Sequence, residues 1–118
     1  MILTEEKTKH VSCLGEMLPI RDALEVVGGK WKVLILTSIM QGNRRFKEIE
    51  RSIPNLNPKV LSKELKDLEE HQLITRVVHD DYPVRIEYLA TEYSYSLKKV
   101  MSELHAWGTR HHQKLFGK

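Results

Sequence analysis

The stretch NPKVLSKELKDLEEHQLI, from Asn57 to Ile74, decides the fold of the sequence around it. Asn57 is a favoured N-cap residue and Pro58 suits a first helical turn, so a helix is predicted to begin here. Three leucines recur at intervals of three and four residues, which predicts one buried stripe along this helix. These leucines are Leu61, Leu65 and Leu68.

Three lysines lie on the opposite face of the same predicted helix. At about 100° per residue, Lys59, Lys63 and Lys66 point away from the leucine stripe. Cations near a helix start oppose the backbone dipole by roughly 0.3–1 kcal/mol each at low salt. A phosphate backbone would reverse that sign, because neutralising phosphates releases counterions. The alternative is a solvated helix face, on which Glu70 would be an ion-pair partner for Lys66 four residues earlier.

The residues before this stretch predict three further helices. Pro19 begins the first, which ends at the glycine pair 28–29. The segment 30–40 is apolar on most sides and predicts a buried helix that contains Trp31. A short third helix follows Phe46 and is stopped by Pro54. Residues 1–17 are polar without a clear period and are predicted to be an N-terminal arm, ahead of one domain over residues 18–118.

After the lysine-faced helix the hydrophobic period changes from helical to alternating. Residues 73–90 are rich in β-branched and aromatic side chains and predict a β-hairpin with its turn at residues 80–83. Thr91 is expected to cap a last helix with a wide apolar stripe. The predicted fold class is therefore mainly α with a small β-hairpin: a short helix, a tight turn and a second helix form a helix-turn-helix, and the hairpin is its wing.

Basic residues occur at all three places where such a unit would meet DNA. The second helix of the motif enters the major groove, and lysine or asparagine there can reach base edges. Arg45, Lys47 and Arg85 are predicted to contact phosphate, which adds affinity without sequence information. Tyr82 is either a wing-tip contact or packed on the wing. The full predicted DNA-binding set is Arg44, Arg45, Lys47, Asn57, Lys59, Ser62, Lys63, Lys66, His79 and Arg85.

Composition is compatible with this interpretation and excludes several others. The 118 residues fit one domain, with 41% hydrophobic and 30% charged residues, which favours a globular protein over a disordered one. The formal charge of +3 permits an anionic partner without requiring one. No apolar run is long enough for a signal peptide or a membrane span, so a cytoplasmic location is expected.

The other chemistry-bearing residues predict no catalytic or cofactor site. His105, His111 and His112 cluster near the end of the chain, but their spacing lacks the carboxylate or cysteine that would complete a metal site. No phosphate-cradling glycine loop and no nucleophile with a nearby base can be proposed, so no cofactor and no enzyme activity are expected. Cys13 is the single cysteine and cannot form an internal disulfide.

Several segments together resemble the HxlR-type winged helix-turn-helix regulators of bacteria. These segments are PIRDALEVVGGKWKVLIL (19–36), GNRRFKEI (42–49), LSKELKDLE (61–69) and PVRIEY (83–88), and the resemblance covers roughly residues 18–112. It implies a cytoplasmic homodimer that binds a palindromic double-stranded DNA operator and regulates transcription, with repression as the simpler outcome. It also implies pairing through the first and last helices. The apolar residues expected at that interface are Ile20, Leu24, Leu97, Val100, Met101, Leu104 and Trp107.

The sequence departs from the family pattern at two positions. Many members carry a cysteine before the proline that starts the first helix, and in several it senses oxidants or electrophiles; here Leu18 holds that place. Cys13 is then either an ordinary reduced thiol or a displaced redox sensor, so a redox or small-molecule effector stays open. Ser94 stands where glycine is usual and is not expected to alter function. A winged-helix module that docks an acidic protein partner is the alternative function.

Overall fold

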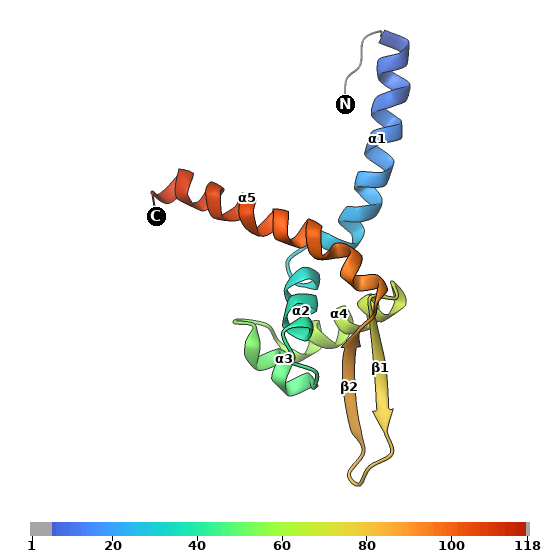
Figure 1. Cartoon of the computed structure of the whole chain (residues 1–118), viewed down its shortest axis with the longest axis vertical. Coiled ribbons are helices and arrows are strands. Elements are labelled where there is room, and N and C mark those ends of the chain that lie inside the picture. Colours follow the sequence, from blue (N-terminus) through green and yellow to red (C-terminus); the bar gives the residue numbers. More distant parts are fainter. Residues whose placement is uncertain (1–5, 118) are drawn as a thin grey trace.

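The computed structural model describes residues 6–117, with side chains from residue 15 onward, as a bundle of helices with one projecting hairpin (Figure 1). The helices are α1 (Glu6–Val27), α2 (Lys32–Met40), α3 (Phe46–Ser52), α4 (Pro58–Glu70), a 3-10 helix η1 (Tyr93–Leu97) and α5 (Lys98–Phe116). The strands are β1 (Ile74–His79) and β2 (Arg85–Ala90), which pair antiparallel. The predicted fold class is confirmed: the chain is mainly helical with one hairpin after the second helix of the motif.

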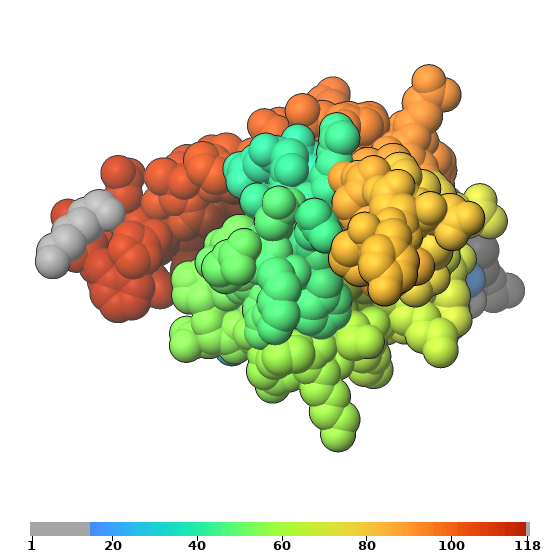
Figure 2. All heavy atoms as spheres, turned by 90° about the horizontal axis from the view of Figure 1, so that it is seen from below, coloured from blue at the N-terminus to red at the C-terminus, as the bar shows by residue number. Residues whose placement is uncertain are grey.

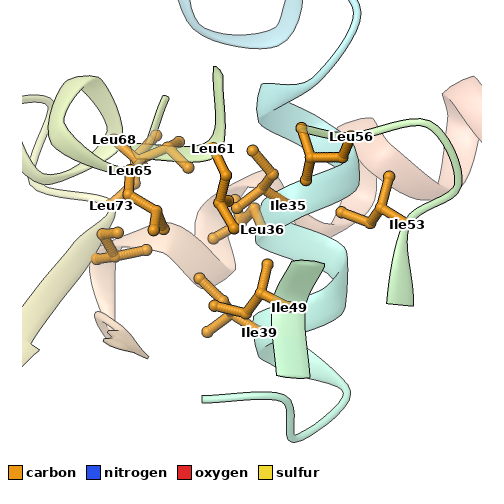
Figure 3. Close-up of a cluster of buried hydrophobic side chains, with 11 residues drawn as sticks. Ile35, Leu36, Ile39, Ile49, Ile53, Leu56, Leu61, Leu65, Leu68 and Leu73 are labelled. Atoms are coloured by element: carbon orange, nitrogen blue, oxygen red, sulfur yellow. The ribbon is translucent and has the colours of Figure 1, made fainter. Parts of the chain in front are cut away.

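The core lies around α2, which is enclosed by α3, α4 and the base of the hairpin (Figure 3). Ile35, Leu36 and Ile39 of α2 are almost fully buried and meet Ile49 of α3. The predicted leucine stripe of α4 completes this core, because all three of its leucines are at most 2% exposed. Burial of a leucine side chain contributes about 1.5–3 kcal/mol, so this stripe fixes which face of α4 remains outside.

The start of α4 agrees with the sequence in detail. The Asn57 side-chain oxygen accepts the Val60 backbone N–H at 2.8 Å, and Pro58 is the first helical residue. The cap satisfies one of the N–H groups that a helix start leaves unpaired. The preceding turn requires a left-handed backbone at Asn55, whose φ is 66°. Asparagine tolerates this conformation better than most residues, which allows the tight passage from α3 to α4.

The hairpin is tied to the body of the protein by backbone hydrogen bonds at its base. Tyr88 N–H donates to the Arg44 carbonyl at 2.7 Å, and Thr91 N–H donates to the Leu73 carbonyl at 3.1 Å. The loop between the strands is one residue longer than predicted, because Val84 lies in it and is exposed. The wing is therefore anchored directly beside the loop that precedes α3.

Three predicted element boundaries are wrong. The first helix begins at Glu6, not at Pro19, and the proline lies inside it. Trp31 precedes α2 and is half-buried against the core, with the Lys30 ammonium 5.0 Å from its ring centroid. The last helix is preceded by the 3-10 turn η1, whose Ser94 N–H donates to the Thr91 hydroxyl at 3.1 Å. Residues 6–17 of the predicted arm lie in α1, and residues 1–5 lie outside the described part, so the division of the chain into an arm and a domain stays a prediction.

Two long helices project from this body (Figure 1). None of the helices in residues 6–117 combines the length and the apolar character needed to cross a bilayer. Exposed apolar side chains line both projecting helices: Ile20 and Leu24 on α1, and Leu104 and Trp107 on α5, are between 46% and 58% exposed. Each helix thus leaves an apolar face that this single chain does not cover.

Candidate nucleic-acid interface

The helix-turn-helix is built from α3 and α4, each of which is held by a local cap. One Glu48 carboxylate oxygen accepts the backbone N–H groups of Arg44 and Arg45 at 3.0 and 3.2 Å. These two hydrogen bonds hold the pKa of Glu48 below its ordinary value, with the bond from Arg44 as the larger cause. Arg44 and Arg45 are both exposed at the entry to α3, as the sequence predicted.

The outer face of α4 carries the predicted cations. Lys59, Lys63 and Lys66 are all exposed, as is Ser62 between them. The Lys63 ammonium donates to an Asp67 oxygen at 3.2 Å, whereas Lys59 and Lys66 form no ion pair within residues 15–117. The pairing of Lys66 with Glu70 that the solvated-face alternative offered is therefore not formed. An aspartate four residues after Lys63 has the same helical spacing, and it is this carboxylate that the lysine contacts.

Asn57 has a more limited role than the sequence analysis expected. Its amide oxygen is used by the cap at Val60 N–H, so only the amide NH₂ group is free to face a base edge. A bidentate contact of asparagine with adenine needs both groups. The capping function of Asn57 thus competes with a full base contact.

Figure 2 looks onto the face where α3, the start of α4 and the hairpin come together. A hollow of about 350 Å³ lies between α3 and β2. It is lined by the charged residues Arg45, Lys47, Glu48 and Arg51, with Phe46 and Ile86 as apolar walls. Arg51 was not predicted. It lies four residues after Lys47 on the same helix, so the projection applied to α4 would have found it. The Lys47 ammonium lies 3.6 Å from a Glu50 oxygen, so Arg45 and Arg51 are the cations of this hollow without a carboxylate partner among the described side chains.

A second hollow separates α4 from the strands. Its volume is about 220 Å³, and its lining includes Ser62, Lys66, Glu69 and Arg76. Arg76 is exposed on β1, forms no ion pair within the described side chains, and was also missed. The alternation of the strand shows only that Arg76 points to one of two faces. The packing of the hairpin against α4 decides that this face adjoins Lys66.

The wing differs electrostatically from the helices. His79 Nε2 lies 2.8 Å from a Glu87 oxygen, and Arg85 Nε donates to Asp81 at 2.9 Å while a second Arg85 nitrogen lies 3.4 Å from Glu87. Both predicted wing contacts are thus already bonded to carboxylates. Tyr82 at the loop is fully exposed, so the alternative in which it packs on the wing is wrong. On this face, the described cations without carboxylate partners include Arg44 and Arg45 before α3, Arg51 on α3, and Lys59 and Lys66 on α4.

A chain of charges also links α4 to the start of α2. The Lys32 ammonium lies 2.7 Å from a Glu64 oxygen and 3.5 Å from Asp67. The contact with Glu64 is the main cause that raises the pKa of Lys32. The pKa of Asp67 is lowered, chiefly by its hydrogen bond from Lys63. Since Lys32 is only 16% exposed, these pairs fix the rotation of α4 about its axis more firmly than surface pairs would.

The remaining candidate residues separate into two groups. Five of the predicted dimer residues are exposed: Ile20, Leu24, Val100, Leu104 and Trp107. The other two, Leu97 and Met101, pack partly against the core.

Among the side chains of residues 15–117, no group of three His, Cys, Asp or Glu residues could hold a metal ion. The Cys13 side chain lies outside the described side chains, so its role stays a prediction.

Comparison with known proteins connects this architecture to one family. The HxlR-like helix-turn-helix family matches residues 26–115. The HTH-type transcriptional regulator YtcD of Bacillus subtilis is 37% identical over 100 residues, which cover 85% of this chain and 79% of YtcD. YkvN of the same organism, also described as an HTH-type transcriptional regulator, is 43% identical over 84 residues, or 71% of each chain.

Solved structures agree with these relatives. The crystal structure of YtcD has a TM-score of 0.73 at 39% identity and covers 78% of this chain and 94% of that one. The redox regulator HypR in its reduced form has a TM-score of 0.77 at 29% identity, covering 85% of this chain and 99% of HypR. The fold, the exposed basic face and the relatives agree: this chain belongs to the HxlR-like helix-turn-helix family of transcriptional regulators.

Proposed function

We propose that this protein is a homodimeric, sequence-specific DNA-binding repressor that acts on a palindromic operator. The observation that carries the proposal is the face shared by α3, α4 and the hairpin, on which Lys59 and Lys66 are exposed and free of carboxylate partners within residues 15–117. In a helix-turn-helix the second helix enters the major groove. The lysines of α4 would then reach base edges and the phosphates that flank the groove, and the arginines at α3 would face phosphates.

The dimer is supported by the two apolar faces that the single chain leaves open. Leu24 on α1 is 55% exposed and Trp107 on α5 is 58% exposed. Large apolar residues exposed together mark protein contact sites more often than isolated ones do. A two-fold pairing through these helices would present two copies of α4 about 34 Å apart, one turn of DNA, which requires a palindromic site. Occupancy of such a site at a promoter is sufficient for repression.

The test replaces the three lysines of α4 together. The K59A/K63A/K66A protein should bind a fluorescent duplex at least about tenfold more weakly, because each lost base contact alone removes about 1–3 kcal/mol. A matched control removes three lysines of α5, Lys98, Lys99 and Lys114, and carries the same change in net charge. Duplex binding that is equal in the two triple variants would contradict the proposal.

The alternative function, docking of an acidic protein, gives a different result in the same assay. Binding to duplex DNA should decline steeply with salt and depend on base sequence for a regulator. A docking module would bind polyglutamate as tightly as duplex DNA and show no preference among duplexes. Selection of tight-binding duplexes from a random pool, followed by inspection for inverted repeats, distinguishes the two and tests the palindrome.

A redox effector is a separate part of the proposal. HypR is named a redox regulator, and here the one thiol available for such a role is that of Cys13. We propose that oxidation of Cys13 changes operator affinity. The parent protein should lose or gain affinity after oxidant treatment, and C13S should not respond. A parent protein whose affinity is the same before and after oxidation would leave Cys13 as an ordinary thiol.

A further inference from the structure

Lys63 is distinguished from its two neighbours on the outer face of α4 by a fixed carboxylate. Its ammonium donates to Asp67 Oδ2 at 3.2 Å, and its side chain remains 72% exposed. The same Asp67 oxygen lies 3.5 Å from the ammonium of Lys32, which belongs to α2 and is 16% exposed. Lys63 is thus attached, through Asp67, to a cation near the core of the protein.

This arrangement holds Asp67 in place better than a helix-surface pair alone would. An exposed pair between residues four apart is weak and easily broken. Lys32, however, is also held by Glu64 at 2.7 Å, so one end of the chain of charges is anchored at the α2–α4 contact. The depressed pKa of Asp67, caused first by the bond from Lys63, means that the carboxylate is charged near neutral pH.

A tethered lysine can serve one kind of DNA contact better than the other. An ammonium group has three donors, and the bond to Asp67 uses one of them. The other two can still meet the acceptors of a guanine edge in the major groove. A phosphate contact depends on the full cationic charge, which Asp67 partly neutralises. Lys59 and Lys66 carry no such neutralising partner within residues 15–117.

We infer that Asp67 is a specificity-determining residue of the DNA-binding face: it withholds Lys63 from phosphates and keeps it directed at base edges. The inference rests on the proposed DNA-binding function and adds a role for an acidic residue within it. Non-specific binding is almost entirely electrostatic, so withholding one cation weakens attachment to arbitrary DNA. Binding to the operator, where base contacts add to the affinity, is weakened less. The ratio of operator to arbitrary binding therefore rises.

The chain provides a closely matched control for testing Asp67. Glu64 lies on the same helix and also pairs with Lys32, but only Asp67 contacts Lys63. D67N and E64Q make the same change in net charge, and each removes one partner of Lys32. A difference between them in DNA binding therefore reports on Lys63. Thermal unfolding of both variants checks that each is folded under the assay conditions.

The experiment measures the salt dependence of binding to a fluorescent duplex of arbitrary sequence. Relative to the parent, D67N should steepen the slope of log K against log salt by about 0.9, the value for one additional phosphate contact. E64Q should leave the slope unchanged. K63A should change the parent slope little, and should flatten the D67N slope by about 0.9. For duplexes selected with the parent, the ratio of selected to arbitrary affinity should fall in D67N.

The outcomes separate this inference from the proposed function. Equal slopes for D67N and E64Q, in a parent that binds duplex DNA, would overturn the role of Asp67 and leave the proposed regulator intact. A K63A change as large as that of K59A in the parent background would also overturn it. A parent that binds no duplex at all would overturn the proposed function, and the role of Asp67 with it.

Discussion

At the scale of single residues, α4 places a buried apolar side chain and an exposed cation at adjacent positions. Leu65 is 2% exposed in the core, and Lys66, the next residue, is exposed on the outer face. The helical period of 3.6 makes this possible, because a step of one residue turns the side chain by more than a quarter of a circle. Stability and the proposed DNA contact are therefore expected to be separable by substitution within this helix.

The first prediction tests that independence. L65A should lower the free energy of unfolding by about 2–5 kcal/mol, since it leaves a cavity in the core. K66A should change it by no more than about 0.5 kcal/mol, because Lys66 is exposed and has no ion pair among the described side chains. Urea unfolding measures both. If both variants lost the same free energy of unfolding, the Lys66 side chain would have to be packed against other residues and not exposed to solvent.

The cap of α4 is a second single-residue test. N57A should cost about 1 kcal/mol, because the Val60 N–H loses its acceptor. N57S should recover most of that loss, since serine also caps helices well. If N57A weakens DNA binding while N57S restores stability but not binding, the free amide NH₂ of Asn57 contributes a contact in addition to its cap. Urea unfolding and fluorescence anisotropy give the two readouts.

At the scale of elements, the short helix α3 depends on one carboxylate. Glu48 accepts two backbone N–H groups at the entry to α3, and its pKa is lowered as a result. A group whose pKa is lower in the folded than in the unfolded state stabilises the fold above its unfolded pKa. That contribution is lost as the pH falls from about 4.3 through the lower folded value. The two hydrogen bonds that Glu48 accepts from Arg44 and Arg45 are therefore expected to weaken over this pH range.

The prediction for α3 follows from the lowered pKa of Glu48, which makes the protein less stable as the pH falls. In the parent protein, the urea midpoint should decline as the pH is lowered from about 6 to about 3. E48Q keeps an acceptor but cannot titrate, so its decline should be shallower over the same range. Asp67, whose pKa is also lowered, should still contribute a decline in both proteins. Parallel curves for E48Q and the parent would show that the Glu48 hydrogen bonds do not persist in solution.

At the scale of the whole molecule, the principal question is what covers the apolar faces of α1 and α5. The chain extends 65 Å along its longest axis, with α1 projecting at one end and the hairpin at the other, while α5 projects sideways from the body (Figure 1). Leu104 on α5 is 46% exposed and lines a hollow with Val100 and Trp107, whereas Leu34 on α2 is 47% exposed and lines a hollow with Ile53 and Pro54. These two leucines have the same chemistry and the same exposure but lie on different surfaces.

The prediction is that L104D produces a monomer and L34D does not. A buried aspartate without a partner strongly disfavours an interface, whereas an aspartate on a free surface is tolerated. Sedimentation equilibrium gives the mass of each variant. Loss of the dimer should also reduce operator affinity, because two half-sites are no longer held together. A dimeric L104D protein would place the interface elsewhere.

The fold was largely predictable because its strongest signals are local. The N-cap and leucine stripe of α4, the change to alternation at Ile74 and the stop before Pro54 each depend on residues close in sequence. The errors occur where local signals are weak. Pro19 is disfavoured within a helix by about 3 kcal/mol, so it predicted a start, but the residues before it continue the helix. Trp31 and η1 are boundary errors of a few residues.

The candidate site was less predictable than the fold. The cations on α3 and α4 could be identified by projecting each helix, and Arg51 was missed because that projection was applied only to α4. The carboxylate partners of the cations could not be predicted in this way. That Arg85 and His79 share Glu87 depends on strand register, and that Asp67 contacts both Lys63 and Lys32 depends on how α2 packs against α4. Neither contact has a local sequence signal.

The sequence by itself determined which face of α4 is buried, since periodicity and capping act over one or two turns of chain. It thereby determined that lysines of α4 face outward beside a wing. Only the tertiary structure decided which of those cations are free and which are bonded to carboxylates, and that Arg76 adjoins Lys66. The physical reason is that ion pairing depends on distances of a few ångströms between elements. Those distances are set by the packing of α2, α4 and the hairpin together.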